Sequence, residues 1–245
     1  MSLPVFWVDG ERLRAGDVVE LDGDEGHHAA VVRRIRIGEL IELTDGAGHL
    51  ARCVVSDAGK GGLRCEVRSR LDVPPPVPRV TVVQALPKGD RGELAVELMT
   101  EVGVDTIVPW AASRCITQWK GERGAKALRR WRSTAREAAK QSRRAWFPDV
   151  TELATTAGVV ELIRPAAMPL ILHEGAGGGV GELAPPPAGD LVLVVGPEGG
   201  ITDDEIDTFS AVGAVAVRFG PTVLRTSTAG AVAAGVLLSR TARWS

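Results

Sequence analysis

One segment, Leu191–Leu238, limits the possible folds of this chain more than any other. It begins with the apolar run Leu191–Val195, which stops at the Gly196–Gly200 loop, and a short apolar run bounded by glycine and proline is typical of a buried strand. A second strand is expected at Val215–Phe219, followed by the loop Gly220–Arg225. Because ligands bind outside the carboxyl ends of the strands in open α/β sheets, these two loops predict a shared binding crevice.

Helix signals follow each of these loops. Thr202 and Glu205 have the spacing of a capping box, in which the two side chains satisfy free backbone amides at a helix start. Thr226 is in position to cap a last helix, Ala229–Arg240, which is rich in alanine and glycine. The Gly196–Gly200 loop has neither the GxGxxG pattern of dinucleotide-binding proteins nor the Lys-Ser/Thr pair of a P-loop. From these residues alone, an ordinary strand–turn–helix connection is an alternative to a ligand site.

Read together, the two loops carry a more specific pattern. The loops Gly196–Gly200 (GPEGG) and Leu224–Ala229 (LRTSTA), the latter ahead of a helix of small residues, resemble those of the SPOUT-class RNA methyltransferases, RsmE type. The resemblance covers nearly the whole chain. It includes Thr100–Val104, the segment Glu137–Arg144 with its Gln-Ser pair, and His27–Arg33.

This resemblance implies a fold and an activity. The fold is α/β, with a C-terminal SPOUT methyltransferase domain tied in a trefoil knot and an N-terminal PUA-like β-barrel that binds RNA. The activity is S-adenosylmethionine-dependent methylation of N3 of a specific uridine in 16S ribosomal RNA, with an assembled or near-assembled small subunit as substrate. The resemblance also implies a homodimer.

The residues of the two loops fit a cofactor held mainly by backbone groups, because proline and glycine leave little side chain between a ligand and the main chain. We expect the cofactor site to be formed by residues of the two loops, of neighbouring strand ends and of the start of the last helix. These residues are Leu172, Gly196, Pro197, Gly199, Gly200, Phe219, Gly220, Leu224, Thr226 and Ala229.

Two charged side chains are candidates for a role in catalysis. Methylation of uridine N3 requires loss of the imide proton and alignment of the nitrogen with the methyl group, and positioning alone can supply much of the acceleration. Arg225 could stabilise negative charge on the uracil oxygens or grip the neighbouring phosphate. Glu198 is the only acid of the first loop; it could accept a proton, but we favour a structural role in which it binds loop amides. The sequence identifies no general base.

The distribution of charge indicates a polyanionic partner. The formal net charge is only −2, yet Ser113–Arg144 carries +9, so the remainder carries −11. Basic residues step along one stripe of the helix expected at Ala125–Arg144, beside an apolar stripe, so that this helix can pack and face phosphates. The alternative is that the basic stripe only faces solvent and binds no partner. The RNA-binding candidates are Arg33, Arg34, Arg36, Arg129, Arg136, Lys140, Gln141, Arg143 and Arg144. Four of the six tryptophans fall in or near this segment and could stack on unpaired bases, but most of them are expected in the core or at an interface.

A proline-rich run divides the chain into two domains. Residues 73–78 contain four prolines and form a stiff linker between residues 1–72 and residues 79–245. The first part has short alternating runs that predict a β-barrel, and the second alternates strands with helices. The expected strands are Val18–Leu21, Leu40–Leu43, Leu50–Val55, Leu63–Val67, Val80–Leu86, Asp105–Trp110 and Pro169–His173, and the further expected helices are His27–Arg34 and Arg91–Glu101.

Cysteine usage and the N-terminus favour a cytoplasmic protein. Cys53, Cys65 and Cys115 have neither CxxC nor metal-ligand spacing, so we expect reduced thiols and no metal site. His27 and His28 are interpreted as capping or packing residues. No signal peptide is recognisable, and no apolar run approaches the ~20 residues of a membrane span.

Two other functions are compatible with the sequence. One is a non-catalytic RNA-binding protein, which a barrel and a basic helix would support but which the intact Gly196–Gly200 loop disfavours. The other is a SPOUT enzyme that methylates a ribose 2′-hydroxyl or another base. The Gln141-Ser142 segment favours the uridine-N3 type by resemblance.

Overall fold

The computed structural model describes residues 3–244, which form two compact units. The N-terminal unit runs to Pro75 and also includes Ala139–Phe147, and the C-terminal unit comprises Pro76–Ala138 and the chain from Pro148 onward. The boundary thus falls within the expected linker. The inclusion of Ala139–Phe147 in the N-terminal unit was not predicted, because the sequence suggested one uninterrupted domain after the linker.

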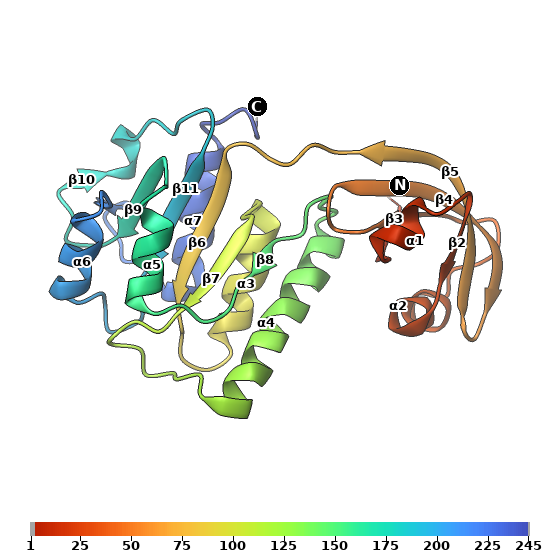
Figure 1. Ribbon diagram of the computed structural model, residues 1–245, viewed down its shortest axis with the longest axis horizontal. Coiled ribbons are helices and arrows are strands. Elements are labelled where there is room, and N and C mark those ends of the chain that lie inside the picture. The colour runs from red at the N-terminus through yellow and green to blue at the C-terminus, as the bar shows by residue number, and fades with distance from the viewer. Residues whose placement is uncertain (1–2, 245) are drawn as a thin grey trace. The chain divides into compact units, whose positions relative to one another are not determined.

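The N-terminal unit is built on a five-stranded sheet of order β1-β3-β4-β5-β2 (Figure 1). Its strands pair antiparallel except for β1 with β3, and alternate residues such as Val19 and Leu21 are buried, as period-two patterning requires. Burial raises the pKa of Cys53 to about 11 and that of Cys65 to about 12, so both thiols stay protonated inside the sheet. The elements are β1 (Val5–Trp7), α1 (Gly10–Arg14), β2 (Val18–Leu21), α2 (Gly23–His27), the π-helix η1 (His28–Val32), β3 (Leu40–Thr44), β4 (His49–Gly59) and β5 (Gly62–Asp72).

The returning segment Ala139–Phe147 is bonded firmly into this unit. Trp146 Nε1 donates to the carbonyl of Val73 at 2.9 Å, and Trp146 forms a β-bridge with Ala47. Gly48 allows this approach, because a Cβ there would lie 2.7 Å from the Trp146 ring. Lys140 Nζ lies 2.5 Å from Glu25 Oε1. The chain thus returns from the C-terminal unit through Ala139–Phe147, and this segment completes the N-terminal unit.

The C-terminal unit contains a seven-stranded sheet of order β10-β12-β9-β11-β6-β7-β8, all of whose pairings are parallel. The central strand β11 is buried from Leu191 to Val195, as its continuous apolar run predicts for a strand covered on both faces. The strands are β6 (Arg79–Ala85), β7 (Thr106–Trp110), β8 (Asp149–Val150), β9 (Met168–Leu172), β10 (Gly178–Gly179), β11 (Asp190–Val195) and β12 (Val215–Arg218).

Helices cover both faces of this sheet (Figure 1). One core contains residues of α3, α4 and α7, and a second core on the other face contains residues of α5 and α6. None of the helices in residues 3–244 is long and apolar enough to span a membrane. The helices are α3 (Arg91–Val102), α4 (Gly121–Gln141), α5 (Thr156–Ile163), α6 (Asp203–Ser210) and α7 (Thr226–Leu238), with a 3₁₀ turn η2 (Val180–Glu182).

Glycine and small residues make α7 thin enough to pack closely. A Cβ at Gly230 would lie 3.0 Å from Met99 Sδ on α3 and 3.1 Å from Val82 Cγ1 on β6. After β12, the chain crosses back over β9 and β11 to reach α7, which packs on β11 and β6. This crossing is the part of the chain for which the resemblance implies the trefoil knot.

The long helix α4 buries the predicted apolar stripe. Leu128, Trp131, Ala135 and Ala138 are buried, and the Trp131 ring packs edge-on against Trp119 with centroids 4.9 Å apart. The helix begins and ends a few residues earlier than expected. Its last turn closes where the amide of Arg144 donates to the carbonyl of Ala139.

Candidate active site

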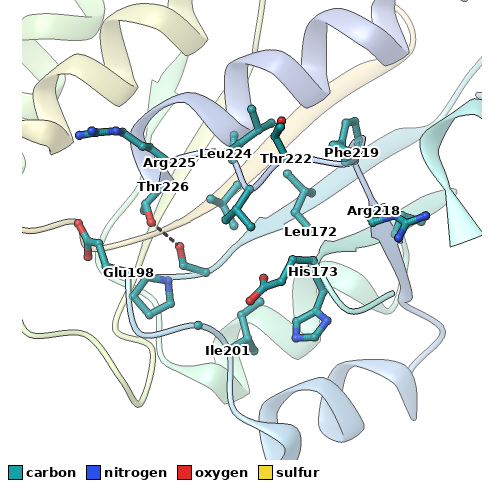
Figure 2. Close-up of a pocket in the computed structure, with 18 of the residues that line it drawn as sticks. Leu172, His173, Glu198, Ile201, Arg218, Phe219, Thr222, Leu224, Arg225 and Thr226 are labelled. Carbon is teal, nitrogen blue, oxygen red and sulfur yellow. Dashed lines mark hydrogen bonds between the residues drawn. The ribbon is translucent and has the colours of Figure 1, made fainter. Parts of the chain in front are cut away.

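A pocket of about 310 Å³ opens at the carboxyl ends of β9, β11 and β12 (Figure 2). This is the crevice predicted from the two loops. It is lined by the residues that end β9, by the loop after β11, and by the loop between β12 and α7. Its location follows from the parallel sheet, in which the carboxyl ends of neighbouring strands meet at one edge.

The pocket has an apolar interior and a charged rim. Its apolar lining comes from Leu172, Val195, Ile201, Val217, Phe219 and Leu224. Its charged lining comes from Arg91, Glu174, Glu198, Arg218 and Arg225. Figure 2 shows Arg225 and Glu198 on one side of the pocket and Arg218 on the opposite side. Such a site suits a ligand with an apolar body and polar ends.

Hydrogen bonds between the two loops fix the shape of the pocket. Thr226 Oγ1 donates to the carbonyl of Gly196 at 3.1 Å, which joins the start of α7 to the end of β11 (Figure 2). Thr226 was expected to cap the last helix, but Arg225 holds the N-cap position and the Thr226 hydroxyl is used between the loops. The buried Gln84 donates from Nε2 to the carbonyl of Thr226 at 3.3 Å. The sequence did not predict this role for Gln84.

Two glycines are required by the path of the first loop. A Cβ at Gly196 would lie 2.6 Å from Ile201 Cγ1, so no larger residue fits without moving Ile201. Gly200 has a φ of +76°, in the left-handed region that glycine adopts at low cost, and its amide donates to the carbonyl of Pro197 at 2.9 Å. The loop therefore exposes main-chain groups to the pocket.

Glu198 links two loops. Its Oε1 accepts a hydrogen bond from the Lys88 amide at 3.1 Å and lies 3.8 Å from Arg91 Nη1. The carboxylate is therefore engaged with the loop after β6 and with the first turn of α3. These contacts support the structural role over that of a proton acceptor.

Behind the first loop, Glu205 forms the predicted capping box with Thr202 and also contacts another loop. Its Oε1 accepts from the Ser113 amide at 2.8 Å and the Ser113 hydroxyl at 2.9 Å, while its Oε2 accepts from the Thr202 amide at 3.1 Å. Burial acts to raise the pKa of this carboxyl, but the hydrogen bonds from Ser113 and Thr202 together lower the pKa below its ordinary value. Glu205 is thus a charged carboxylate that holds α6 to the loop after β7.

The structure brings together eight of the ten residues expected at the cofactor site, and all eight line the pocket. Gly199 and Gly220 do not line it. Gly199 faces the loop after β7, where its carbonyl accepts from Arg114 Nη1 at 3.1 Å and where a Cβ would lie 3.2 Å from Arg114 Cβ. Gly220 has a φ of +91° and turns the chain after β12.

Several lining residues were missed by the sequence analysis. Arg91 begins α3, a helix that the sequence located but did not connect with the pocket. His173 and Glu174 follow β9, and Arg218 ends β12. His173 and Arg218 lie at the carboxyl ends of strands that the sequence predicted, and Glu174 follows directly after one; these positions were the available signal.

The RNA-binding candidates lie on both units, and the structure separates them by environment. On α4, Arg129 and Arg136 are exposed, but neighbouring Arg130 and Arg132 lie 3.1 Å from Glu93 and 2.9 Å from Glu152. The charge of the basic segment is thus partly neutralised by acids from elsewhere in the chain, which the sequence count did not reveal.

The remaining candidates belong to the N-terminal unit. The prediction that Lys140 binds RNA is wrong. Its side chain is only 9% exposed and its ammonium is paired with Glu25, so it is not presented to a phosphate. Arg144 is half-buried. Exposed candidates are Arg33, Arg34, Arg36, Gln141 and Arg143.

Comparison with known proteins agrees with this architecture. Residues 74–238 match the family described as RNA methyltransferase domain, and residues 21–68 match the RNA methyltransferase PUA domain. The Ribosomal RNA small subunit methyltransferase E of Mycobacterium bovis is 55% identical over the whole chain and 94% of that relative. The protein of the same name from Bacillus subtilis is 26% identical over 89% of each chain.

Solved structures with the same fold include two with a bound ligand. A methyltransferase of Legionella pneumophila in complex with the cofactor SAM has a TM-score of 0.86 and 29% identity, covering 98% of this chain and 99% of that one. The Ribosomal RNA small subunit methyltransferase E of Neisseria gonorrhoeae bound to S-adenosyl methionine has a TM-score of 0.85 and 28% identity, covering 97% and 98%. The chain therefore belongs to the RNA methyltransferase family and has the SPOUT-class fold with an N-terminal PUA-like domain.

Proposed function

We propose that this protein transfers a methyl group from S-adenosylmethionine to N3 of one uridine in 16S ribosomal RNA of the small subunit. The observation that carries the proposal is the pocket at the carboxyl ends of β9, β11 and β12, whose wall combines apolar side chains with main-chain groups of the glycine-rich loop after β11. The relatives named for small-subunit ribosomal RNA, and the structural neighbours that hold this cofactor, support the same reading.

The residues of the pocket fit this cofactor. A volume of about 310 Å³ is in the range of small-molecule sites. Leu172, Phe219 and Leu224 provide an apolar surface for an adenine ring, while the Gly196 and Gly200 backbone provides polar groups that can read its edge. When bound, S-adenosylmethionine supplies an electrophilic methyl group on a positively charged sulfur.

The side chains of the rim act on the nucleotide. Uracil gains negative charge on its oxygens as the N3 proton leaves, and a guanidinium at the mouth of the pocket stabilises this charge or holds the adjacent phosphate. Arg225 is exposed at this mouth, and its backbone starts α7, so its position is fixed by that helix. Glu198 holds the loop after β11 to the loop after β6 and to the start of α3 through its contacts with Lys88 and Arg91. Positioning by these residues supplies the main part of the acceleration.

The same proposal includes the setting of the reaction. The enzyme acts as a homodimer in the cytoplasm, where ribosomal subunits are assembled, on an assembled or near-assembled small subunit. The homodimer is carried over from the resemblance.

Nucleoside analysis of ribosomal RNA tests the proposal. Deletion of the gene should remove 3-methyluridine from small-subunit RNA and leave every ribose methylation in place, and the plasmid-borne gene should restore it. Loss of a 2′-O-methyl nucleoside instead would assign the protein to a different SPOUT reaction. An unchanged nucleoside profile, with no cofactor binding by the purified protein, would favour the non-catalytic alternative.

A further inference from the structure

Arg91 brings a second guanidinium to the pocket, in addition to that of Arg225. Arg91 lines the pocket as the first residue of α3. Figure 2 shows Glu198 on the same side of the pocket as Arg225, and Arg91 Nη1 lies 3.8 Å from Glu198 Oε1. Arg218 lines the opposite side. One side of the pocket therefore carries two arginines and one carboxylate.

The backbone of Arg91 is fixed at this place from both directions along the chain. Before it, the amide of Lys88 donates to Glu198 Oε1 at 3.1 Å and attaches the loop after β6 to the loop after β11. After it, the buried Gly92 packs against the ring of Trp131, where a Cβ would lie 2.7 Å from Nε1. This close contact fixes the rotation of α3, so that the side chain one position earlier lines the pocket.

The guanidinium of Arg91 is available to a ligand. Its separation of 3.8 Å from Glu198 is an ionic contact longer than a hydrogen bond, and Glu198 Oε1 already accepts from the Lys88 amide. Within residues 3–244 the Arg91 side chain donates no hydrogen bond, and it is 43% exposed. Its N–H donors are thus free for a bound nucleotide, while the attraction of Glu198 keeps the side chain at the pocket.

Methylation at N3 of uridine requires stabilisation of charge at two separate atoms. N3 loses its proton to solvent, and its lone pair then forms a bond to the methyl carbon as the carbon–sulfur bond breaks and leaves its electron pair on sulfur. Before the transfer, the negative charge is shared by N3 and by the carbonyl oxygens O2 and O4 on either side of it. One guanidinium cannot bridge both oxygens without covering N3, which must face the methyl group. Stabilisation at both oxygens therefore requires two donors.

We propose that Arg91 is a catalytic residue that donates to one of the two carbonyl oxygens beside N3, while Arg225 donates to the other. The inference rests on the proposed function and deepens it for the same pocket. It explains why two guanidinium groups lie on one side of the pocket, and it gives Glu198 the role of keeping Arg91 in place.

The competing ligand for Arg91 is the carboxylate of the cofactor. Glu198 disfavours this ligand, because a second carboxylate would then lie next to the first. The opposite side of the pocket suits the cofactor better. Glu174 follows β9, which pairs with β12, the strand that Arg218 ends. An arginine and a glutamate at neighbouring strand ends match a ligand that carries both a carboxylate and an ammonium.

The test uses the full-length protein and small ribosomal subunits from a strain that lacks the gene, and it measures single-turnover formation of 3-methyluridine. Arg91→Gln removes the charge, and Arg91→Lys keeps it. Arg164→Gln is the matched control, because Arg164 lies outside the pocket lining and forms a similar ion pair, at 3.7 Å, with Glu161. Thermal unfolding and S-adenosylmethionine affinity are measured on the same samples.

We expect Arg91→Gln to lower the single-turnover rate roughly thirtyfold, which is less than the loss for an enclosed donor because the side chain is partly exposed. Arg91→Lys should recover part of the rate, and Arg164→Gln should react as the parent does. Cofactor affinity and the unfolding temperature should stay near the parental values. The rate of Arg91→Gln should also reach its plateau at a higher pH, because a uracil without this neighbouring charge keeps its proton to a higher pH.

A double-mutant cycle with Glu198→Gln separates a direct role of Arg91 from a structural one. If Arg91 contacts the nucleotide, the loss of rate caused by Arg91→Gln should persist in the Glu198→Gln protein. If Arg91 only holds Glu198 in place, that loss should disappear, and the proposal is overturned.

Two further results would overturn the proposal. One is a folded Arg91→Gln protein with the parental rate and pH profile. The other is a loss of S-adenosylmethionine affinity that accounts for the whole loss of rate, because it would assign Arg91 to the cofactor. Both results leave the proposed function standing, since the parent protein still forms 3-methyluridine. A parent protein that binds S-adenosylmethionine but forms no 3-methyluridine would contradict the proposed function, and with it the assignment of Arg91 to the uracil.

Discussion

At the scale of single residues, the hydroxyl of Thr226 joins the two loops that form the pocket. Thr226→Val keeps the size of the side chain but removes the bond to Gly196. Because a buried hydrogen bond of this kind contributes about 1 kcal/mol, we expect S-adenosylmethionine to bind roughly fivefold more weakly, as measured by calorimetry. Thr208→Val, which alters an exposed hydroxyl on α6, should bind the cofactor normally. If Thr226→Val binds S-adenosylmethionine as tightly as Thr208→Val does, the bond from Thr226 to Gly196 does not shape the site.

Arg225 is expected to act on the nucleotide and not on the cofactor. Arg225→Ala should lower turnover by roughly a hundredfold, in the range seen when one charge-stabilising donor is removed, while cofactor affinity stays near the parental value. Arg225→Lys should recover part of the activity, because it keeps the charge but loses the planar donor geometry. Steady-state kinetics and calorimetry on the same preparations check this. A parallel loss of cofactor affinity would make Arg225 a structural residue of the loop.

The residues that sequence reasoning located, and those it missed, differ in a physical way. Gly196, Gly200 and Leu224 could be assigned to the pocket because they stand in or next to loops that directly follow a strand. Gln84 could not, because its role depends on a carbonyl 142 positions later in the chain. Lys140 was misjudged for the same reason, since its partner Glu25 is distant in sequence.

At the scale of elements, Glu205 fastens α6 to the loop after β7, and this link should depend on pH. The folded-state pKa lies below the ordinary value of 4.5, so the stabilisation is complete above pH 4.5 and is lost as the pH falls through the folded pKa. We expect Glu205→Gln to cost about 1–3 kcal/mol at neutral pH, because an amide group would face a donor. On acidification below pH 4.5, the unfolding temperature of Glu205→Gln should fall less than that of the parent protein.

The control for this prediction is Asp203→Asn in the same helical turn. Asp203 is exposed, so its substitution should leave both the stability and its pH dependence nearly unchanged. Identical acid sensitivity of the parent and Glu205→Gln would show that other carboxyl groups determine the loss of stability.

Elements with strong local signals could be predicted, and short ones could not. The capping box of α6, the bounds of α3 and the buried run of β11 each matched the structure within a residue or two. The strands β1, β8 and β10 are only two or three residues long, and their existence depends on partners elsewhere in the chain. Helix α5 was missed, although Thr155 caps it.

At the scale of the whole molecule, the basic face of α4 is expected to contribute to RNA affinity. Arg129→Gln should reduce the salt slope of RNA binding by up to about 0.9 on a duplex or ~0.7 on a single strand. Cofactor affinity should not change, since Arg129 does not line the pocket. Arg130→Gln is the matched control, because Arg130 is paired with Glu93. If the variant keeps the parental oligomeric state and the salt slope is unaltered, the basic residues of α4 only face solvent and do not contact RNA.

The central claim, methyl transfer to uridine N3 from the pocket beside β11, is tested most directly with purified components. Small ribosomal subunits from a strain that lacks the gene are incubated with the protein and S-adenosylmethionine carrying a deuterated methyl group. The RNA is then digested to nucleosides for mass spectrometry. We predict that the label appears in 3-methyluridine alone and is strongly reduced with Arg225→Ala. Label on a ribose 2′-hydroxyl or on another base, or no label with a protein that binds the cofactor, would contradict this assignment.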